Sequence, residues 1–210
     1  MGGADVVART ALNPEFWEQR YLEGKTRWDT GQAAPPFVSL LELPNAPKPG
    51  KIAVLGSGNG HDALLFSEHG FEVVGFDFAP SAIANSTSSA RDRGLSAQFL
   101  QRNIFELEPE FSNRFDYVLE HGCFCSISPA FRPRYVQIVH SLLHPNGSLI
   151  ALFLIHAYAN RPPFGIEPTS LLKLFSDYFE PLTFGLALNS SRHRKGQEYL
   201  ASFRVKNRHN

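Results

Sequence analysis

Cysteine, net charge and long apolar runs are all scarce in this sequence. Only two cysteines occur, Cys123 and Cys125, and they stand two residues apart in a segment that we expect to be a strand. That spacing is too short for ordinary disulfide geometry, and no second pair is present to complete a zinc site. We therefore expect a reduced, cytoplasmic setting and no metal centre.

Charge is balanced, because lysine plus arginine and aspartate plus glutamate both number 20 among 210 residues. No overall field then draws the chain to nucleic acid or to an anionic membrane. The longest apolar run, 149–155, falls far short of a membrane span, and the N-terminus lacks the basic and then apolar order of a secretory signal. We expect a small-molecule partner, no nucleic acid, no membrane, and a monomer.

One stretch, 51–77, carries the strongest pattern. A short apolar run is followed by the glycine turn GSGNG at 56–60, by apolar positions at helical spacing, and by a second apolar run that ends in Asp77. Glycine lets the backbone turn sharply and approach a ligand, and the start of the helix offers unpaired N–H groups. An acid that ends the second strand can accept both hydroxyls of a ribose. The unit predicts a nucleoside pocket.

The spacing of the turn bears on which nucleoside it binds. A dinucleotide fingerprint that starts at Gly56 requires glycine at position 61, where the chain has His61. The close helix packing that seats a pyrophosphate is therefore not encoded, and a cofactor without phosphate, S-adenosylmethionine, fits better. The spacing favours a methyltransferase over an NAD-dependent oxidoreductase, and a plain glycine-rich loop is a third interpretation.

Both tryptophans lie near the start of the chain. Asn13 and Pro14 predict a helix start, after which Trp17 and Tyr21 share a face, and Trp28 follows in a loop. Two interpretations stay open. The indoles simply pack on the domain, or they belong to a lid whose rings face the cofactor sulfonium in a cation–π contact of about 0.5–2 kcal/mol.

Further candidates stand where the predicted strands end, because ligands of an open parallel sheet bind beyond the carboxyl ends. Asn103 and Ile104 follow the third strand and are placed to contact an adenine, although a plain exit from the strand explains them as well. Glu120 ends the fourth strand and points into the site. His156 and Tyr158 open an irregular segment after the fifth strand, where lone histidines are more often surface residues than bases.

The whole chain predicts an α/β fold: a doubly wound, seven-stranded, mostly parallel sheet in the Rossmann-like version typical of class I methyltransferases, with a C-terminal antiparallel hairpin. We expect a turn at 144–147 before the fifth strand and the last two strands at 184–188 and 199–205. The boundaries that we expect are a mobile lead-in at 1–12, a single domain at 13–210, and a cofactor lid at 13–43.

A series of short motifs spans most of the chain: FWE at 16–18, WDTG at 28–31, GSGNGHD at 56–62, NIF at 103–105, FCSISP at 124–129, Arg132, PPF at 162–164 and RKG at 194–196. In this order and spacing they resemble the thiopurine, thiol and halide S-methyltransferase family. The resemblance implies S-adenosylmethionine as cofactor, S-adenosylhomocysteine as product, and a soft acceptor such as a thiol, hydrosulfide, a halide or a thiopurine.

The resemblance also implies roles for single residues. It gives Trp17, Tyr21 and Trp28 as the aromatic lid, Gly56 and Gly58 at the methionine part, Asp77 at the ribose, Asn103 and Ile104 at the adenine, Glu120 near the amino end, and Arg132 facing cofactor and acceptor; Phe78 is expected at the cofactor as well. The chain departs from the family at Tyr21, where plant members have tryptophan, and at Asn103, where many members have aspartate. Neither departure removes the type of contact.

Methyl transfer from a sulfonium to a soft anion is an in-line displacement that needs alignment and exclusion of water more than it needs a base. We hypothesise that Phe124, Phe164 and Tyr158 wall the acceptor site. A free thiol of pKa about 8.5 is a few per cent ionised at neutral pH, so His156 or Tyr158 could assist without being essential. A non-catalytic S-adenosylmethionine sensor on the same fold is an alternative.

Overall fold

The computed structural model describes residues 13–156 and 161–206. The expected lead-in at 1–12 and the candidate Tyr158 lie outside these ranges. Among the residues described, no helix combines the length and the apolar character that crossing a bilayer requires.

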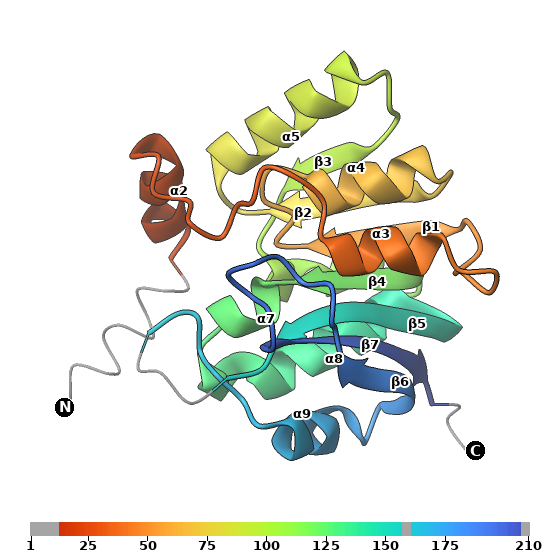
Figure 1. The fold of residues 1–210 in the computed structure, drawn as a ribbon. Coiled ribbons are helices and arrows are strands. Elements are labelled where there is room, and N and C mark those ends of the chain that lie inside the picture. Colours follow the sequence, from red (N-terminus) through yellow and green to blue (C-terminus); the bar gives the residue numbers. More distant parts are fainter. Residues whose placement is uncertain (1–12, 157–160, 207–210) are drawn as a thin grey trace.

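Seven strands of the described chain form one sheet in the order β3-β2-β1-β4-β5-β7-β6 (Figure 1). Their bounds are β1 (Lys51–Leu55), β2 (Glu72–Asp77), β3 (Gln98–Gln101), β4 (Phe115–His121), β5 (Leu143–Leu154), β6 (Phe179–Leu186) and β7 (Glu198–Val205). The first five strands pair in parallel, and β7 runs antiparallel between β5 and β6. The predicted doubly wound sheet with a C-terminal antiparallel hairpin is confirmed.

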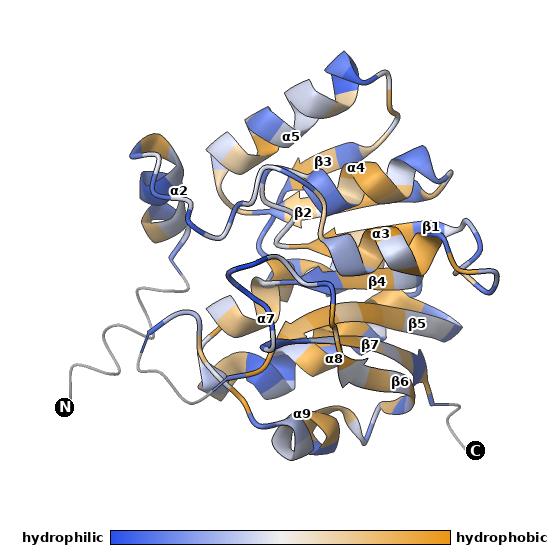
Figure 2. Ribbon diagram, in the orientation of Figure 1, coloured by the Kyte–Doolittle hydropathy of each residue, from blue (hydrophilic) through white to orange (hydrophobic). Residues whose placement is uncertain are grey.

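Helices cover both faces of the sheet, as its alternating side chains require. In β1, Ile52 and Val54 pack in one buried cluster with side chains of α3 (Pro35–Leu41), α4 (His61–Glu68) and α5 (Pro80–Asp92). Ala53 and Leu55 point the other way, into a second cluster with α8 (Arg132–Leu142) and α9 (Pro168–Phe175). Hydrophobic residues accordingly concentrate along the strands in Figure 2. Each fully buried large apolar side chain contributes about 1.5–3 kcal/mol.

Helix α2 (Pro14–Leu22) begins where the sequence predicts and stands apart from the sheet in Figure 1. The side chain of Asn13 accepts a hydrogen bond from the Glu15 N–H at 2.7 Å, and Pro14 occupies the first turn. None of the residues of α2 is buried. The helix is tied to the first turn of α5 by Glu18, whose carboxylate accepts from the Ser81 N–H at 3.0 Å and from the Ser81 hydroxyl at 2.6 Å.

Four short helical segments were not predicted: η1 (Ile104–Glu106), α6 (Glu108–Phe111), α7 (Cys123–Ser126) and η2 (Pro129–Phe131). The expectation that Cys123 and Cys125 lie in a strand is therefore wrong. Gly122, at φ +82°, ends β4 and turns the chain into α7. Both cysteines are free and buried within that helix.

Two strand boundaries also differ from the prediction. Strand β5 begins at Leu143, so the expected turn at 144–147 lies inside it, where the pairing with β4 is irregular and Asn146 takes φ +75°. Strand β6 spans 179–186 rather than 184–188. Pro181 suggests a break, but β6 is an edge strand whose register shifts between Pro181 and Thr183, and proline is tolerated at such a position.

Candidate active site

The carboxyl ends of the parallel strands open onto a cavity of about 1080 Å³. Its walls come from α2 and the loop after it, from the turn between β1 and α4, and from the segments that follow β2, β3 and β4. The structure brings these predicted cofactor-binding residues together in its lining: Trp17, Tyr21, Trp28, Gly56, Gly58, Asp77, Phe78, Asn103 and Ile104. The volume slightly exceeds the range of about 300–1,000 Å³ usual for small-molecule sites, which leaves room for a nucleoside and an acceptor.

The glycine turn lines the cavity with bare backbone. Gly56 and Gly58 have φ values of +60° and +54°, which side chains with a Cβ rarely adopt. A Cβ on Gly56 would lie 3.1 Å from the Cys123 sulfur, and one on Gly58 would lie 3.2 Å from the Tyr21 hydroxyl oxygen. Any side chain at Gly58 would therefore fill the space between the turn and the aromatic residues.

Asp77 faces the same turn from the end of β2. One carboxylate oxygen accepts a hydrogen bond from the Gly58 N–H and the other from the Ala79 N–H, each at 3.0 Å. Burial raises the pKa of Asp77, although the backbone N–H groups of Ala79, Gly58 and Phe78 oppose the rise. A carboxylate has about four acceptor positions, so the two oxygens keep capacity for two hydroxyl donors.

Three aromatic side chains cover the cavity from α2 and the following loop. The ring centroids of Trp17 and Trp28 are 5.3 Å apart, and those of Tyr21 and Trp28 are 5.8 Å apart, both in edge-to-face geometry. Burial and the nearby carboxylate of Asp77 raise the pKa of Tyr21 above its ordinary value. The phenol therefore stays neutral, and the three rings offer electron-rich faces to a cationic ligand.

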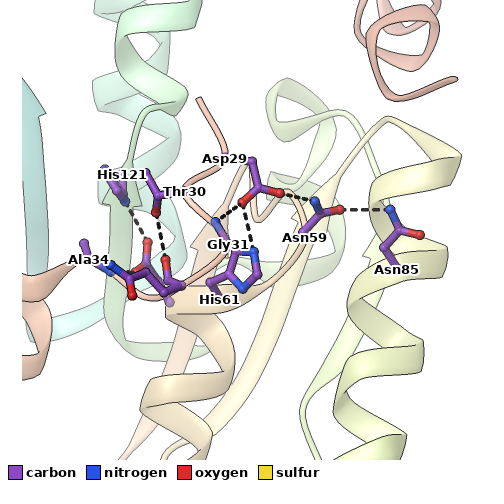
Figure 3. Close-up of polar contacts among 10 residues, drawn as sticks. Asp29, Thr30, Gly31, Ala34, Asn59, His61, Asn85 and His121 are labelled. Atoms are coloured by element: carbon purple, nitrogen blue, oxygen red, sulfur yellow. Dashed lines mark hydrogen bonds and ion pairs between the residues drawn. The ribbon is translucent and has the colours of Figure 1, made fainter. Parts of the chain in front are cut away.

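A polar network links the loop after α2 to the glycine turn (Figure 3). The Asp29 carboxylate accepts from the Asn59 side-chain amide, from His61 Nε2 at 2.9 Å and from the Gly31 N–H at 2.8 Å. The other end of the Asn59 side chain accepts from Asn85 of α5 at 3.0 Å. The loop that carries Trp28 is thus fastened to the turn beneath it.

A second network joins α4 to the ends of β4 and β7. Asp62 accepts from the Ala34 N–H at 2.7 Å, and its other oxygen lies 2.7 Å from His121 Nδ1. His121 Nε2 lies 3.5 Å from a carboxylate oxygen of Glu198, which is buried. Burial alone would lower the pKa of His121, but the Asp62 and Glu198 carboxylates raise it to about 10. His121 is therefore an imidazolium at neutral pH.

A family model described as thiopurine S-methyltransferase matches residues 12–195, which is most of the chain. The chain belongs to this family. S-adenosylmethionine is thus its cofactor and S-adenosylhomocysteine the product, as the sequence predicted.

Two named plant proteins and one solved structure are similar to this chain. The chain is 30% identical to thiocyanate methyltransferase 1 of Arabidopsis thaliana over 90% of its own length and 83% of that protein. It is 31% identical to probable thiol methyltransferase 2 of the same plant over 75% and 70% of the two chains. Its fold is similar to that of a Burkholderia thailandensis 1,6-didemethyltoxoflavin-N1-methyltransferase with bound S-adenosylhomocysteine, at a TM-score of 0.77 and 21% identity over 99% and 92% of the chains.

The residues of the cavity fit the cofactor of the S-methyltransferase family. The bare backbone at Gly56 and Gly58 allows close approach by the methionine part. The free acceptor positions of Asp77 suit the two ribose hydroxyls. The aromatic cluster suits the sulfonium, which carries a positive charge but no hydrogen-bond donor.

Glu120 is the one predicted cofactor residue that does not line the cavity. Its carboxylate is 1% exposed and accepts from the Phe124 N–H at 2.8 Å and the Tyr135 hydroxyl at 2.5 Å. Burial raises its pKa to about 7. Strand β4 turns this side chain toward the start of α7 and toward α8, and its expected place near the cofactor's amino end stays a prediction.

The predicted acceptor residues Phe124, Arg132 and Phe164 also lie outside the cavity wall. Each is at most 3% exposed. The Arg132 guanidinium stacks 4.5 Å from the centre of the Phe124 ring and donates to the backbone carbonyls of Gly165 and Phe164 at 3.0 and 2.8 Å. In the structure these three residues fix the 162–165 segment to α7 and α8, and their contact with an acceptor stays a prediction.

The candidate bases are His156, which the structure describes, and Tyr158, which it does not. His156 does not line the cavity, and its Nε2 is buried with no hydrogen-bond partner among the described residues. Tyr158 lies outside the described residues.

Sequence reasoning missed Asp29 and His121, which both line the cavity. The sequence did offer a signal for Asp29, because this acid directly follows a loop tryptophan in the motif WDTG. His121 had no local signal, because its partners Asp62 and Glu198 are 59 and 77 positions away in the sequence.

Proposed function

We propose that this chain transfers the methyl group of S-adenosylmethionine to a small soft nucleophile, such as a thiol, hydrosulfide, a halide or a thiopurine. One observation carries the proposal: the bare glycine turn, the acid Asp77 and the aromatic cluster of Trp17, Tyr21 and Trp28 face one cavity. The relatives named for thiocyanate and thiol methylation support the same class of acceptor.

The proposed mechanism is an in-line displacement. The bound cofactor supplies a methyl group on a positively charged sulfur. Asp77 holds the sugar, the turn at 56–60 holds the methionine part, and the indoles of Trp17 and Trp28 shield the sulfonium from water. Alignment of two reactants contributes up to roughly 7–11 kcal/mol in intramolecular models.

Basic side chains favour an anionic acceptor. Arg27, Arg134, Arg161 and Arg194 line the cavity, although the charge of the whole chain is balanced. A local excess of positive charge attracts anions into a cleft and raises their concentration there. Hydrosulfide, thiolates and halides all carry the matching charge.

The proposal needs no general base. An acceptor that arrives ionised has no proton to lose, and a thiol of pKa about 8.5 supplies a few per cent thiolate at neutral pH. His156 lies outside the cavity wall, so the mechanism assigns it no proton transfer.

We further propose that the chain acts as a cytoplasmic monomer on small molecules, without nucleic acid, and that residues 13–43 form a cofactor lid on a single domain. The two free cysteines support a reducing compartment. The aromatic residues of α2 and its loop, which line the cavity without being part of the sheet, support the lid.

The test incubates the purified full-length chain with S-adenosylmethionine and hydrosulfide, iodide, thiocyanate, thiophenol or 6-mercaptopurine. Headspace chromatography measures methanethiol and methyl iodide, and liquid chromatography measures S-adenosylhomocysteine and the other products. Phenol, the hard counterpart of thiophenol, is the matched control. We expect S-adenosylhomocysteine to form in step with methylated product for at least one soft acceptor, and none with phenol.

Two results would contradict the proposal. Binding of S-adenosylhomocysteine without turnover on any of these acceptors would indicate a sensor. Binding of NAD with no binding of S-adenosylhomocysteine, measured by isothermal titration, would indicate an oxidoreductase.

A further inference from the structure

Asp29 occupies an unusual place for an acid, because it follows the lid residue Trp28 directly and is turned away from solvent. Its side chain is 16% exposed. The carboxylate meets donors from two parts of the chain: Gly31 of its own loop, and Asn59 and His61 of the glycine turn and the start of α4. A carboxylate only accepts hydrogen bonds, so His61 Nε2 carries the proton in this contact.

The contact continues beyond the turn. Asn59 also accepts from Asn85 in α5, and Figure 3 shows Asp29, Asn59 and Asn85 in one row. At the other end of the loop, the Ala34 N–H donates to Asp62, one residue after His61. The segment 29–34 is therefore attached at both ends to the glycine turn and the start of α4.

The contacts of Asp29 act on the loop, whereas the Glu18 carboxylate holds α2 to Ser81 of α5. Helix α2, which bears Trp17 and Tyr21, has no buried residue, and Trp28 meets these two rings edge to face. The contacts of Asp29 with Asn59 and His61 fix the loop residue that directly follows Trp28. Charge-assisted hydrogen bonds of the kind that Asp29 accepts are stronger than neutral ones.

We propose that Asp29 is a positioning residue that latches the aromatic lid onto the glycine turn and thereby sets the affinity for S-adenosylmethionine and S-adenosylhomocysteine. This inference rests on the proposed function. Asp29 acts through Trp28 and through the turn, so it controls retention of the cofactor and leaves acceptor affinity unchanged.

The first measurement needs no ligand. The chain has only two tryptophans, Trp17 and Trp28, and both belong to the lid, so intrinsic indole fluorescence reports on the lid alone. In Asp29→Ala and Asp29→Asn we expect red-shifted emission and stronger quenching by acrylamide than in the wild type. The control is Glu15→Ala, which removes an exposed acid of α2, the helix that bears Trp17. We expect this variant to keep the wild-type spectrum. Circular dichroism confirms that each variant is folded, and Asp29→Asn, with the same shape, serves if the alanine variant does not fold.

The second measurement separates positioning from general damage. We expect Asp29→Ala to raise the Kd for S-adenosylhomocysteine and the KM for S-adenosylmethionine by about tenfold or more, the equivalent of one lost interaction of about 1.4 kcal/mol. The KM for the acceptor, at saturating cofactor, stays within about twofold. Asp29→Asn keeps one acceptor oxygen and lies between the alanine variant and the wild type.

A double-mutant cycle with His61→Ala completes the test. If the two residues form one latch, His61→Ala weakens cofactor binding by itself but adds little to Asp29→Ala. Three results would each overturn the latch. The first is a double variant whose increase in Kd is the product of the two single increases. The others are an unchanged Kd in Asp29→Ala, or unchanged fluorescence and quenching in that variant. A wild-type chain that binds no S-adenosylhomocysteine would instead overturn the proposed function, and the ligand-free fluorescence would still decide whether the latch exists.

Discussion

At the scale of single residues, the site depends on groups whose hydrogen-bonding capacity is only partly used within the protein. Each carboxylate oxygen of Asp77 accepts one backbone hydrogen bond, from Gly58 or from Ala79. Each oxygen can accept one more hydrogen bond, which we propose comes from a ligand. Glu120, in contrast, is enclosed by Phe124 and Tyr135 and serves the fold. Asp77 and Glu120, at the carboxyl ends of β2 and β4 on either side of β1, thus differ in their surroundings, and we propose a ligand-binding role for Asp77 alone.

Replacing Asp77 by asparagine tests this distinction. An amide nitrogen cannot accept from a backbone N–H or from a ribose hydroxyl, so we expect Asp77→Asn to raise the Kd for S-adenosylhomocysteine by about tenfold to a hundredfold, as loss of a charge-assisted hydrogen bond of about 1.5–3 kcal/mol implies. Isothermal titration measures the change. Asp116→Asn is the matched control, since Asp116 also accepts from a backbone N–H, that of Lys51 at 2.8 Å, and does not line the cavity. Equal affinity in the two variants would show that Asp77 does not hold the sugar.

His121 gives a pH dependence of stability. Its pKa in the folded chain is about 10, against 6.5 as the ordinary value, so its contribution to stability is complete below pH 6.5 and is lost as the pH rises toward 10. The slope for one proton is at most about 1.4 kcal/mol per pH unit. Urea unfolding between pH 7 and 10 should show a decline in the wild type that is flatter in His121→Gln. The exposed His69 provides the control, His69→Gln, which keeps the wild-type slope. Parallel curves for His121→Gln and the wild type would refute the role of the imidazolium.

At the scale of elements, α2 differs from the sheet and from the helices packed on it in how it is attached. The sheet and its helices are held by two buried apolar clusters, whereas α2 buries no residue and is attached by polar contacts and ring edges. Elements with few buried apolar contacts open at lower free energy than the core. If the proposed lid opens for cofactor exchange, we expect α2 to move while the sheet stays intact.

The Glu18 contact with Ser81 makes this difference measurable. Glu18→Ala removes both acceptor oxygens that hold α2 to α5. We expect backbone amides of α2 to exchange with deuterium about tenfold faster, with the melting temperature within about 2 °C of the wild type, because no core contact is lost. Hydrogen exchange with mass spectrometry on a peptide that covers 14–22 measures the effect, and Glu15→Ala is again the control. Unchanged protection of α2, or a large loss of melting temperature, would contradict the account.

At the scale of the whole molecule, ligand binding should stabilise the fold by mass action. At a concentration of 100 times its Kd, S-adenosylhomocysteine adds about 2.7 kcal/mol, which raises the melting temperature of a chain of this size by roughly 5–11 °C. NAD at the same concentration should leave the melting temperature unchanged, since His61 stands where a dinucleotide site has its third glycine. Differential scanning calorimetry measures both melting temperatures. A rise with NAD and none with S-adenosylhomocysteine would contradict the assignment of the cavity to S-adenosylmethionine.

The sheet and the cofactor side of the cavity were predictable because their signals are local. The glycine turn, Asp77 and the two tryptophans each lie within a short stretch whose spacing carries the meaning. The acceptor side was not predictable in the same way. Whether Arg132 faces a ligand or the Phe124 ring depends on how α7 and α8 pack, and the helical turn at 123–126 follows from the positive φ of Gly122. Neither fact is encoded in a short motif.

A crystal structure of the chain with S-adenosylhomocysteine tests the central claim most directly. The account predicts one nucleoside in the cavity, with its ribose hydroxyls on the Asp77 carboxylate and its sulfur facing the rings of Trp17 and Trp28. A nucleoside bound elsewhere, or an Asp77 side chain turned away from the sugar, would contradict it.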